Sequence, residues 1–333
     1  MYRCGLRTGS VLELRGKSVL VSGGAGFIGS HLVDRLIEEE PARLTVVDNF
    51  FLGRDQNLEA ARAKRPDLEV KRMDASDLAA MQDVAVEREI DVVFDLAVIP
   101  LPTSLTYPVW TVQTNVGIAT TFCELARRGL IDTLVHCSSS EAYGSARRVP
   151  MDEDHPHDAI TPYAASKSAA DAVVTSYIKT FGIDATIVRP FNNFGPRQNL
   201  GSYAGIIPIV VQRVATGQTI EIHGDGEQTR DFIFVRETAE LLVRAYQNES
   251  TRGRVLNVAT GQETSVNELV TALLSAMGAP DHPVVHTEER AGDVRRHCAD
   301  VSLAAELLSY QSHPLSEAQL RETVDYYLAE FDR

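Results

Sequence analysis

A glycine-rich segment near the start of the chain constrains its fold more than any other stretch. An apolar run at residues 17–21 leads into Gly-Gly-Ala-Gly-Phe-Ile-Gly (residues 23–29), and residues 30–40 have the pattern of a helix. Gly23, Gly26 and Gly29 allow a tight turn after a buried strand and bring bare backbone close to a phosphate. The N-terminus of the following helix attracts that anion. The segment therefore predicts a nucleotide-binding turn.

An acidic residue follows at the position that distinguishes one nucleotide from another. Asp48 ends the next apolar run, about 20 residues beyond Gly29. A carboxylate at this place accepts hydrogen bonds from both hydroxyls of an adenosine ribose and repels a 2′-phosphate. We therefore expect a dinucleotide cofactor, and NAD rather than NADP.

Composition and charge exclude several kinds of partner. The chain has 333 residues and a formal net charge of −14. Nucleic acids and anionic membranes favour a basic face, so we expect neither as a partner and predict a small-molecule substrate. No apolar run approaches the ~20 residues of a membrane span, and residues 1–10 lack the apolar core of a signal peptide. These features favour a cytoplasmic enzyme.

The cysteines and histidines suggest no metal site. Cys4, Cys123, Cys137 and Cys298 are too scattered for a Cys-x-x-Cys site and too few for a disulfide scaffold, so we interpret them as free thiols. The His-Pro-His sequence at residues 155–157 is interpreted as an exposed turn rather than a metal site.

Strand and helix patterns alternate through the first half of the chain. The pattern predicts strands at residues 17–21, 43–48, 68–74, 91–97 and 133–138, and helices at residues 30–40, 55–64, 109–128 and 162–181. Residues 1–16 give no signal for either. This alternation predicts an α/β fold with a doubly wound parallel sheet, the Rossmann arrangement.

A tyrosine and a lysine lie one turn apart on a predicted helix. Thr161 is a suitable N-cap and Pro162 suits the first helical position, so Tyr163 and Lys167 share one helix face. A tyrosine with its ordinary pKa of ~10 is a poor base at neutral pH. An ammonium group one turn away stabilises the phenolate and lowers that pKa, which predicts acid–base chemistry here.

Together these motifs resemble the extended short-chain dehydrogenase/reductase family, and within it the NAD-dependent nucleotide-sugar epimerases, dehydratases and decarboxylases. The resemblance spans nearly the whole chain. It rests on residues 23–29, Asp48-Asn49, Asp74, Leu96-Ala97, Asn115, Ser-Ser-Ser-Glu-Ala-Tyr-Gly (138–144), the Tyr163/Lys167 pair, Arg-Pro-Phe-Asn-Asn-Phe-Gly-Pro-Arg (189–197) and Gly-Asp-Gly-Glu-Gln-Thr-Arg-Asp-Phe (224–232).

The resemblance implies roles for named residues. Ser139 is the catalytic hydroxyl, Tyr163 takes the proton from a sugar 4-hydroxyl, and Lys167 also holds the nicotinamide ribose while hydride passes from C4 to NAD. For Asp74, a bond to the adenine amino group competes with a helix cap for the segment that starts at Ser76. The residues that the resemblance assigns to the cofactor are Gly23, Gly26, Phe27, Ile28, Gly29, Asp48, Asn49, Asp74, Ala75, Leu96, Ala97, Asn115, Tyr163 and Lys167.

The resemblance also divides the chain. It implies an NAD domain at residues 1–189 and a smaller nucleotide-sugar domain at residues 190–333, interleaved because a strand at residues 255–259, within a segment near 232–262, returns to the first domain. The substrate residues that it implies are Ser104, Asn192, Arg230 and Arg290, with the last two neutralising a diphosphate. A surface ion pair with Glu227 or Asp231 is the alternative for Arg230. The helices near 109–128 and 162–181 imply a homodimer.

The sequence constrains the final reaction less than it constrains the oxidation at C4 that these enzymes share. Dehydratases of the family usually have Asp-Glu after the catalytic hydroxyl, whereas this chain has Ser140 and Glu141. Ser-Glu also resembles UDP-glucuronate decarboxylases, but residues 192–198 and 289–296 are more similar to 4-epimerases. We expect a 4-epimerase of a UDP-sugar, with the decarboxylase and then the 4,6-dehydratase as alternatives. A non-catalytic NAD sensor is disfavoured because Ser139, Tyr163 and Lys167 are all present.

Overall fold

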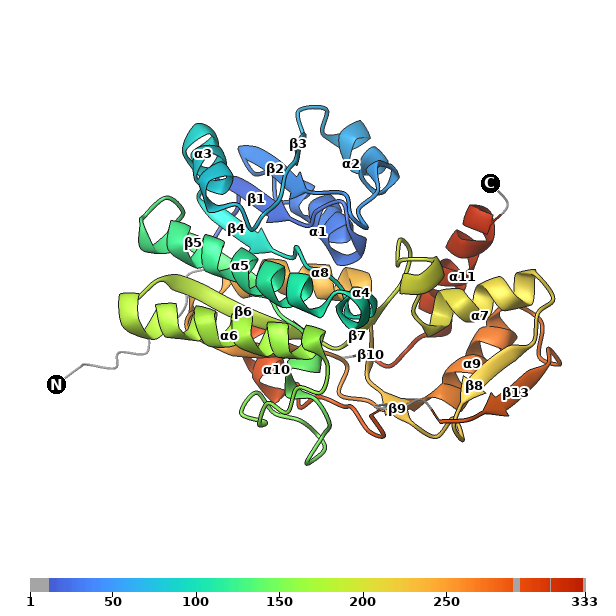
Figure 1. The fold of residues 1–333 in the computed structure, drawn as a ribbon. Coiled ribbons are helices and arrows are strands. Elements are labelled where there is room, and N and C mark those ends of the chain that lie inside the picture. Colours follow the sequence, from blue (N-terminus) through green and yellow to red (C-terminus); the bar gives the residue numbers. More distant parts are fainter. Residues whose placement is uncertain (1–11, 290–293, 312, 332–333) are drawn as a thin grey trace.

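One parallel sheet organises the computed structural model, which describes residues 12–289, 294–311 and 313–331 (Figure 1). The sheet has seven strands in the order β11-β6-β5-β4-β1-β2-β3, and every neighbouring pair is parallel. The predicted α/β, doubly wound sheet is confirmed. The strands are β1 (Ser18–Ser22), β2 (Arg43–Asp48), β3 (Glu69–Arg72), β4 (Val92–Asp95), β5 (Thr133–Cys137), β6 (Asp184–Pro190) and β11 (Val255–Val258).

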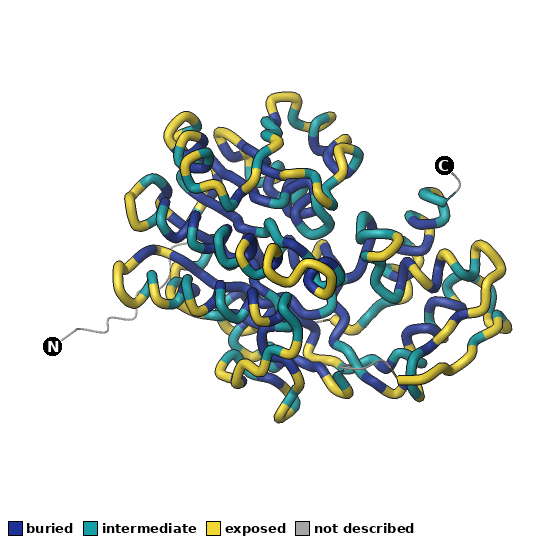
Figure 2. Tube along the Cα trace, in the orientation of Figure 1, coloured by how far each residue is buried: buried dark blue, intermediate teal, exposed yellow. Residues whose placement is uncertain are grey.

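Helices cover both faces of this sheet, so its central strands are buried on both sides (Figure 2). That burial explains why the strands read as continuous apolar runs in the sequence. One face packs on α1 (Phe27–Ile37), α2 (Glu59–Lys64), α8 (Val235–Gln247) and α10 (Ser302–Leu308). The other face packs on α3 (Leu78–Arg88), α5 (Pro108–Arg127) and α6 (Pro162–Phe181).

A second apolar core lies away from the sheet, where α7, α9, α11, β8 and β13 gather in Figure 1. Three pairs of strands frame it: β7 (Asn192–Phe194) with β10 (Phe232–Phe234), β8 (Ile220–His223) with β13 (Val284–Thr287), and β9 (Thr229–Arg230) with β12 (Thr264–Ser265). Its helices are α7 (Ile206–Ala215), α9 (Val266–Ala276) and α11 (Glu317–Phe331).

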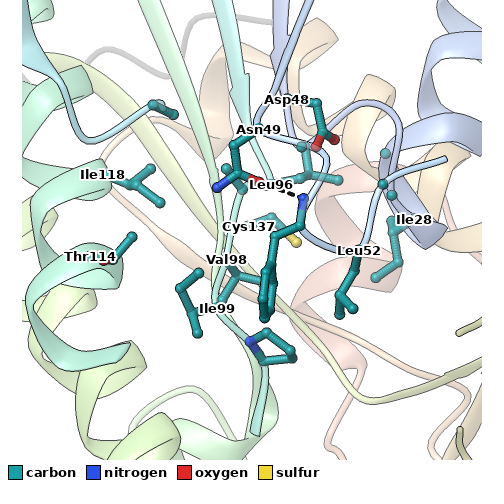
Figure 3. A pocket seen from close by; sticks show the side chains of 18 of the residues that line it. Ile28, Asp48, Asn49, Leu52, Leu96, Val98, Ile99, Thr114, Ile118 and Cys137 are labelled. Carbon is teal, nitrogen blue, oxygen red and sulfur yellow. Dashed lines mark hydrogen bonds between the residues drawn. The ribbon is translucent and has the colours of Figure 1, made fainter. Parts of the chain in front are cut away.

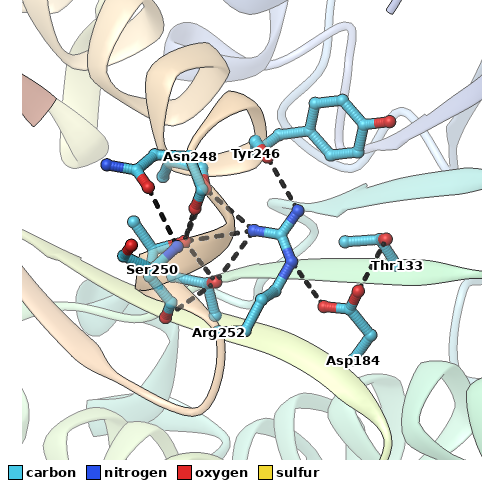
Figure 4. Close-up of polar contacts among 9 residues, drawn as sticks. Thr133, Asp184, Tyr246, Asn248, Ser250 and Arg252 are labelled. Carbon is cyan, nitrogen blue, oxygen red and sulfur yellow. Dashed lines mark hydrogen bonds and ion pairs between the residues drawn. The ribbon is translucent and has the colours of Figure 1, made fainter. Parts of the chain in front are cut away.

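The chain returns from this second core to the sheet twice. The strand expected at residues 255–259 is β11, at the edge of the sheet beside β6. The turn before it is held by Arg252, which pairs with Asp184 on β6 and donates to the Tyr246 carbonyl at the end of α8, at 2.7 Å (Figure 4). The second return is α10, whose Ala304 and Leu308 join the core under the sheet and which the sequence did not predict.

Local differences from the expected elements are small and have physical causes. Helix α1 begins at Phe27, inside the glycine-rich segment, because Gly26 already serves as its N-cap. The expected loop at residues 98–108 contains the short helix α4 (Leu101–Thr106), with a proline in its first turn. Among the residues described, no helix is both long and apolar enough to cross a membrane.

Candidate active site

A cavity of about 230 Å³ opens at the carboxyl edge of the sheet, where β1, β2, β4 and β5 end (Figure 3). Every residue expected to bind the cofactor lines it except Asn115. Residues that the sequence did not single out also contribute, among them Leu52, Met73, Thr114, Ile118 and Ser138. The carboxyl edge of an open parallel sheet is the usual ligand site of this fold.

The glycine-rich turn forms one wall of the cavity because it carries no side chains. Gly23 has φ +68°, and a Cβ at Gly29 would lie 2.1 Å from the Gly23 carbonyl oxygen. Helix α1 can therefore pack directly on the turn. No side chain caps its N-terminus at Gly26, so its first N–H groups remain available to an anion. This arrangement fits the pyrophosphate of NAD.

Asp48 stands at the end of β2 with its carboxylate already oriented. Its oxygens accept hydrogen bonds from the backbone N–H groups of Ala25 at 3.0 Å and Phe50 at 2.8 Å. Gly53 passes directly over it, since a Cβ there would lie 2.7 Å from Oδ1. Burial raises the pKa of Asp48, and the two backbone bonds oppose that shift. A carboxylate retains further acceptor sites, as a ribose diol requires.

Two other expected cofactor residues have defined contacts. The Asn115 amide pairs with both backbone groups of Ile99, at 2.7 and 3.0 Å, and donates to Ser166 Oγ at 2.9 Å. Asn115 therefore fixes the backbone of Ile99, which lines the cavity, although Asn115 itself does not line it. Asp74 lines the cavity and accepts from Ser76, whereas the N-cap of α3 is Asp77. The alternative interpretation of Asp74 as that helix cap is therefore wrong.

Tyr163 and Lys167 line the cavity, and Ser139 contacts Tyr163 although it is not itself among the lining residues. Thr161 caps α6 by accepting from Ala164 N at 3.1 Å. This start places Tyr163 and Lys167 one turn apart. Ser139 follows β5 as the N-cap of a short 3-10 turn, η2 (Ser140–Tyr143), and its hydroxyl hydrogen-bonds with Tyr163.

The electrostatics of Tyr163 differ from the expectation. Burial raises the pKa of the phenol above its ordinary value, the Ser139 hydrogen bond opposes this shift, and the Glu141 carboxylate adds to it. Lys167 directs its ammonium to the Cys137 carbonyl oxygen, at 2.9 Å. The expected lowering of the pKa by Lys167 is not observed in the protein alone, so the neutral phenol, a proton donor, is favoured.

Two residues beside the segment 139–143 are not predicted from the sequence. Ser138 lines the cavity, and its buried hydroxyl has no hydrogen-bond partner among the described residues. His297 is buried, hydrogen-bonds to the main chain of Ser140, and packs its ring 4.9 Å from that of Phe191. No local pattern signals His297, because it lies far along the chain from Ser140.

The expected exposed turn at residues 155–157 is wrong for the first histidine. His155 is buried, and its Nε2 accepts from the Arg147 N–H at 3.1 Å. The rings of His155 and His157 both pack edge-on against Tyr143. Both rings therefore pack on one buried tyrosine.

A second cavity of about 460 Å³ contains two of the expected substrate residues, Asn192 and Arg230. The Asn192 carboxamide oxygen is buried without a hydrogen-bond partner among the described residues, and Arg230 donates to the Thr229 and Val294 carbonyls. The segment 192–199 reaches both cavities, because Asn199 lines the first, and Asn192, Phe194 and Gln198 are among the residues that line the second. Ser104 is buried, with its hydroxyl on the Leu101 carbonyl. Arg290 lies outside the described residues.

Comparison with known proteins finds matches over most of the chain. The NAD dependent epimerase/dehydratase family matches residues 19–259. A UDP-glucose 4-epimerase from Mycolicibacterium smegmatis is 35% identical over 310 residues, which is 92% of this chain and 97% of the relative. A UDP-N-acetyl-alpha-D-glucosaminuronate decarboxylase from Bacillus cytotoxicus is 28% identical, over 93% of this chain and 98% of the relative.

A solved structure is similar over nearly its whole length. It is a UDP-N-acetylglucosamine 4-epimerase from Methanobrevibacter ruminantium in complex with UDP-N-acetylmuramic acid. Its sequence is 32% identical, the TM-score is 0.88, and the match covers 95% of this chain and 99% of that one. Such agreement over both ends of the chain includes the second core as well as the sheet.

His297 makes the stability of the protein depend on pH. Burial lowers its pKa to about 4, whereas the unfolded chain takes up this proton near pH ~6.5. The contribution is therefore intact above pH ~6.5 and is lost as the pH falls towards 4. We expect a loss of about 2 kcal/mol between pH 7 and 5 from this residue. Urea unfolding of the His297→Gln variant should show a correspondingly smaller difference between these pH values, and an equal difference would contradict the assignment.

Proposed function

Because this chain belongs to the NAD dependent epimerase/dehydratase family, we propose that it is a 4-epimerase of a UDP-linked sugar. The observation that carries the proposal is the hydrogen-bonded Ser139–Tyr163 pair beside Lys167, with Tyr163 and Lys167 lining the NAD cavity. The similarity to the UDP-glucose and UDP-N-acetylglucosamine 4-epimerases supports the choice of reaction.

In this proposal, residues of the chain carry out the acid–base catalysis. NAD, when bound, supplies a hydride acceptor and afterwards a hydride donor, so the reaction needs no external redox partner. Tyr163 removes the proton of the sugar 4-hydroxyl and returns it, while Ser139 hydrogen-bonds to the same oxygen. Lys167 provides a buried positive charge one turn along α6, which favours the phenolate once its ammonium approaches Tyr163.

The second cavity is the proposed site for the nucleotide part of the substrate. Arg230 supplies positive charge for a diphosphate, and beside it the Asn192 carboxamide, whose oxygen is buried without a partner among the described residues, offers a polar contact. Ile206, Ile220 and Ile222 form an apolar wall suited to a base. The segment that joins the two cavities would then place the sugar between the diphosphate and Tyr163.

Glu141 is the residue that supports the two alternative reactions, 4,6-dehydration and decarboxylation. Its carboxylate lies close enough to Tyr163 to raise the pKa of that phenol. A carboxylate in this place can take part in proton transfer at C5 in a dehydratase or lie beside the reacting carboxylate in a decarboxylase. The position before it is Ser140, which is buried and cannot act as the acid that the dehydratases have there.

We also propose a homodimer formed through α5 and α6. The two helices pack side by side on one face of the sheet. The outward positions of α6 include Ala165, Ala172 and Ser176, which are exposed, small and uncharged. Small side chains allow a second copy of the same face to approach closely in a symmetric contact.

Tyr163→Phe should abolish most activity without disturbing the cofactor. Loss of general-base catalysis typically costs about 10²- to 10⁴-fold in kcat. We expect a fall of that size in the epimerisation of UDP-glucose or UDP-N-acetylglucosamine, with the NAD content of the purified protein unchanged. The matched control is Tyr177→Phe, on the same helix, where the hydroxyl contacts Glu124 instead. Full activity of Tyr163→Phe would refute its proposed role.

Glu141→Gln separates the candidate reactions. A 4-epimerase touches no proton at C5, so kcat for epimerisation should change by less than about 10-fold. Products of UDP-glucose, UDP-N-acetylglucosamine and UDP-glucuronate can be identified by mass and NMR. A loss of more than about 100-fold, equivalent to ~2.7 kcal/mol in the transition state, would instead favour the dehydratase or decarboxylase.

Ala172→Arg tests the dimer. Two long charged side chains would meet at the symmetric contact, so sedimentation at micromolar concentration should change from dimer to monomer. Ala318→Arg, at an exposed position on α11, is the control and should leave the dimer intact. A wild-type protein that sediments only as a monomer would contradict the proposal.

A further inference from the structure

A row of buried polar side chains crosses four neighbouring strands beneath α6, outside the roles described so far. Ser22 on β1, Asp95 on β4, His136 on β5 and Arg189 on β6 are each less than a tenth exposed. Strand register pairs Ser22 with Asp95 and Asp95 with His136. Burial of this much polarity in the face that packs on α5 and α6 requires an explanation beyond sheet stability.

The row begins at the floor of the NAD cavity. Ser22 Oγ accepts from the backbone N–H groups of Leu96 and Ala97, both at 3.1 Å, and donates to Asp95 Oδ1 at 2.7 Å. The other Asp95 oxygen lies 2.8 Å from His136 Nδ1. Because an ionised carboxylate only accepts, Nδ1 of His136 carries the proton and Nε2 points away from Asp95.

The row ends on α6. Asp171 of that helix accepts from Arg189 Nε at 2.8 Å with one oxygen, and its other oxygen lies 3.8 Å from His136 Nε2. His136 Nε2 and Asp171 Oδ1, which face each other, are buried and have no hydrogen-bond partner among the described residues. A separation of 3.8 Å is longer than a hydrogen bond, and the Asp171 oxygen only accepts. A small movement of α6 therefore completes the contact when Nε2 carries a proton as well as Nδ1, with His136 as an imidazolium between the two carboxylates.

Asp171 and Lys167 share one helix face. Asp171 follows Lys167 by one turn and Tyr163 by two turns. On β5, the adjacent residues His136 and Cys137 contact these two positions: His136 faces Asp171, and the Cys137 carbonyl accepts from Lys167. Lys167 therefore ties one turn of α6 to the end of β5, two residues before Ser139, and Asp171 brings the next turn to face the same strand.

We propose that His136 is a positioning residue that, oriented by Asp95, anchors α6 through Asp171 and so holds Tyr163 and Lys167 in place against Ser139. The inference rests on the proposed roles of Tyr163 and Lys167. It explains why a histidine is buried between two carboxylates behind the site, although it lies outside the cavity lining.

Three variants of His136 test the two sides of the ring separately. His136→Phe keeps the ring and removes both nitrogens, Asn retains a donor near the Nδ1 position, and Gln retains one that reaches towards Asp171. A displacement of about 1 Å can cost about 100-fold in rate, so we expect kcat of His136→Phe to fall by about 10- to 100-fold. KM for UDP-glucose and the NAD content should stay within about twofold. Gln should restore most of kcat, and Asn should not.

Thr186→Val is the matched control for a general loss of stability. Thr186 is fully buried in the same sheet and bonds to the Thr251 carbonyl at 3.1 Å, away from α6. It should lower the melting temperature without lowering kcat. Hydrogen exchange measured by mass spectrometry supplies a readout independent of substrate: residues 163–171 should exchange faster in His136→Phe than in wild type or Thr186→Val.

The outcomes separate this proposal from the proposed function. A wild-type protein that epimerises no UDP-sugar would refute the function, and the exchange experiment would still decide whether His136 anchors α6. The positioning role is overturned if kcat of His136→Phe stays within about twofold of wild type, if Thr186→Val lowers kcat equally, or if Asn restores kcat as well as Gln. If His136→Phe does not fold, the comparison of Gln with Asn decides in the same way.

Discussion

The close approach of Gly29 to the Gly23 carbonyl is the constraint on which the rest of the structure depends. The space between them cannot hold a Cβ, since one at Gly29 would lie 2.1 Å from that oxygen. The contact lets α1 start directly after the turn and pack on β1 and β2, with its uncapped N-terminus at the cavity. A side chain at Gly29 would move the helix away from the turn, and one at Gly23 would lie 2.8 Å from the backbone nitrogen of Ala97, at the end of the neighbouring strand β4.

The parallel sheet then brings the other parts of the site to the same edge. Each strand ends on the same side, so Asp48 at the end of β2, Leu96 and Ala97 after β4, and Ser138 after β5 lie around one cavity although they are far apart in the chain. Helix α6 crosses this edge and adds Tyr163 and Lys167. Parallel strands impose this convergence because every crossover must return to the opposite edge before the next strand begins.

The neutral phenol of Tyr163 shows how burial governs the chemistry of the site. Desolvation opposes the phenolate, and Lys167 satisfies the Cys137 carbonyl in the protein alone. In the proposed mechanism, the phenolate therefore depends on small displacements of α6 relative to β5 that bring Lys167 towards Tyr163. Contacts that anchor this helix, at Asp171 as well as at Lys167, acquire functional importance because proton transfer is sensitive to changes of less than an ångström.

Local patterns in the sequence determined the nucleotide turn, the carboxylate at Asp48, the capped start of α6 and the spacing of Tyr163 and Lys167, because each depends on residues within a turn or two of one another. The tertiary structure alone decided that Asn115 holds Ile99, that His297 contacts Ser140, and that α10 returns to the sheet. It also decided the pKa of Tyr163. These features depend on desolvation and on contacts between residues remote in the chain, and neither leaves a periodic or local signal in the sequence.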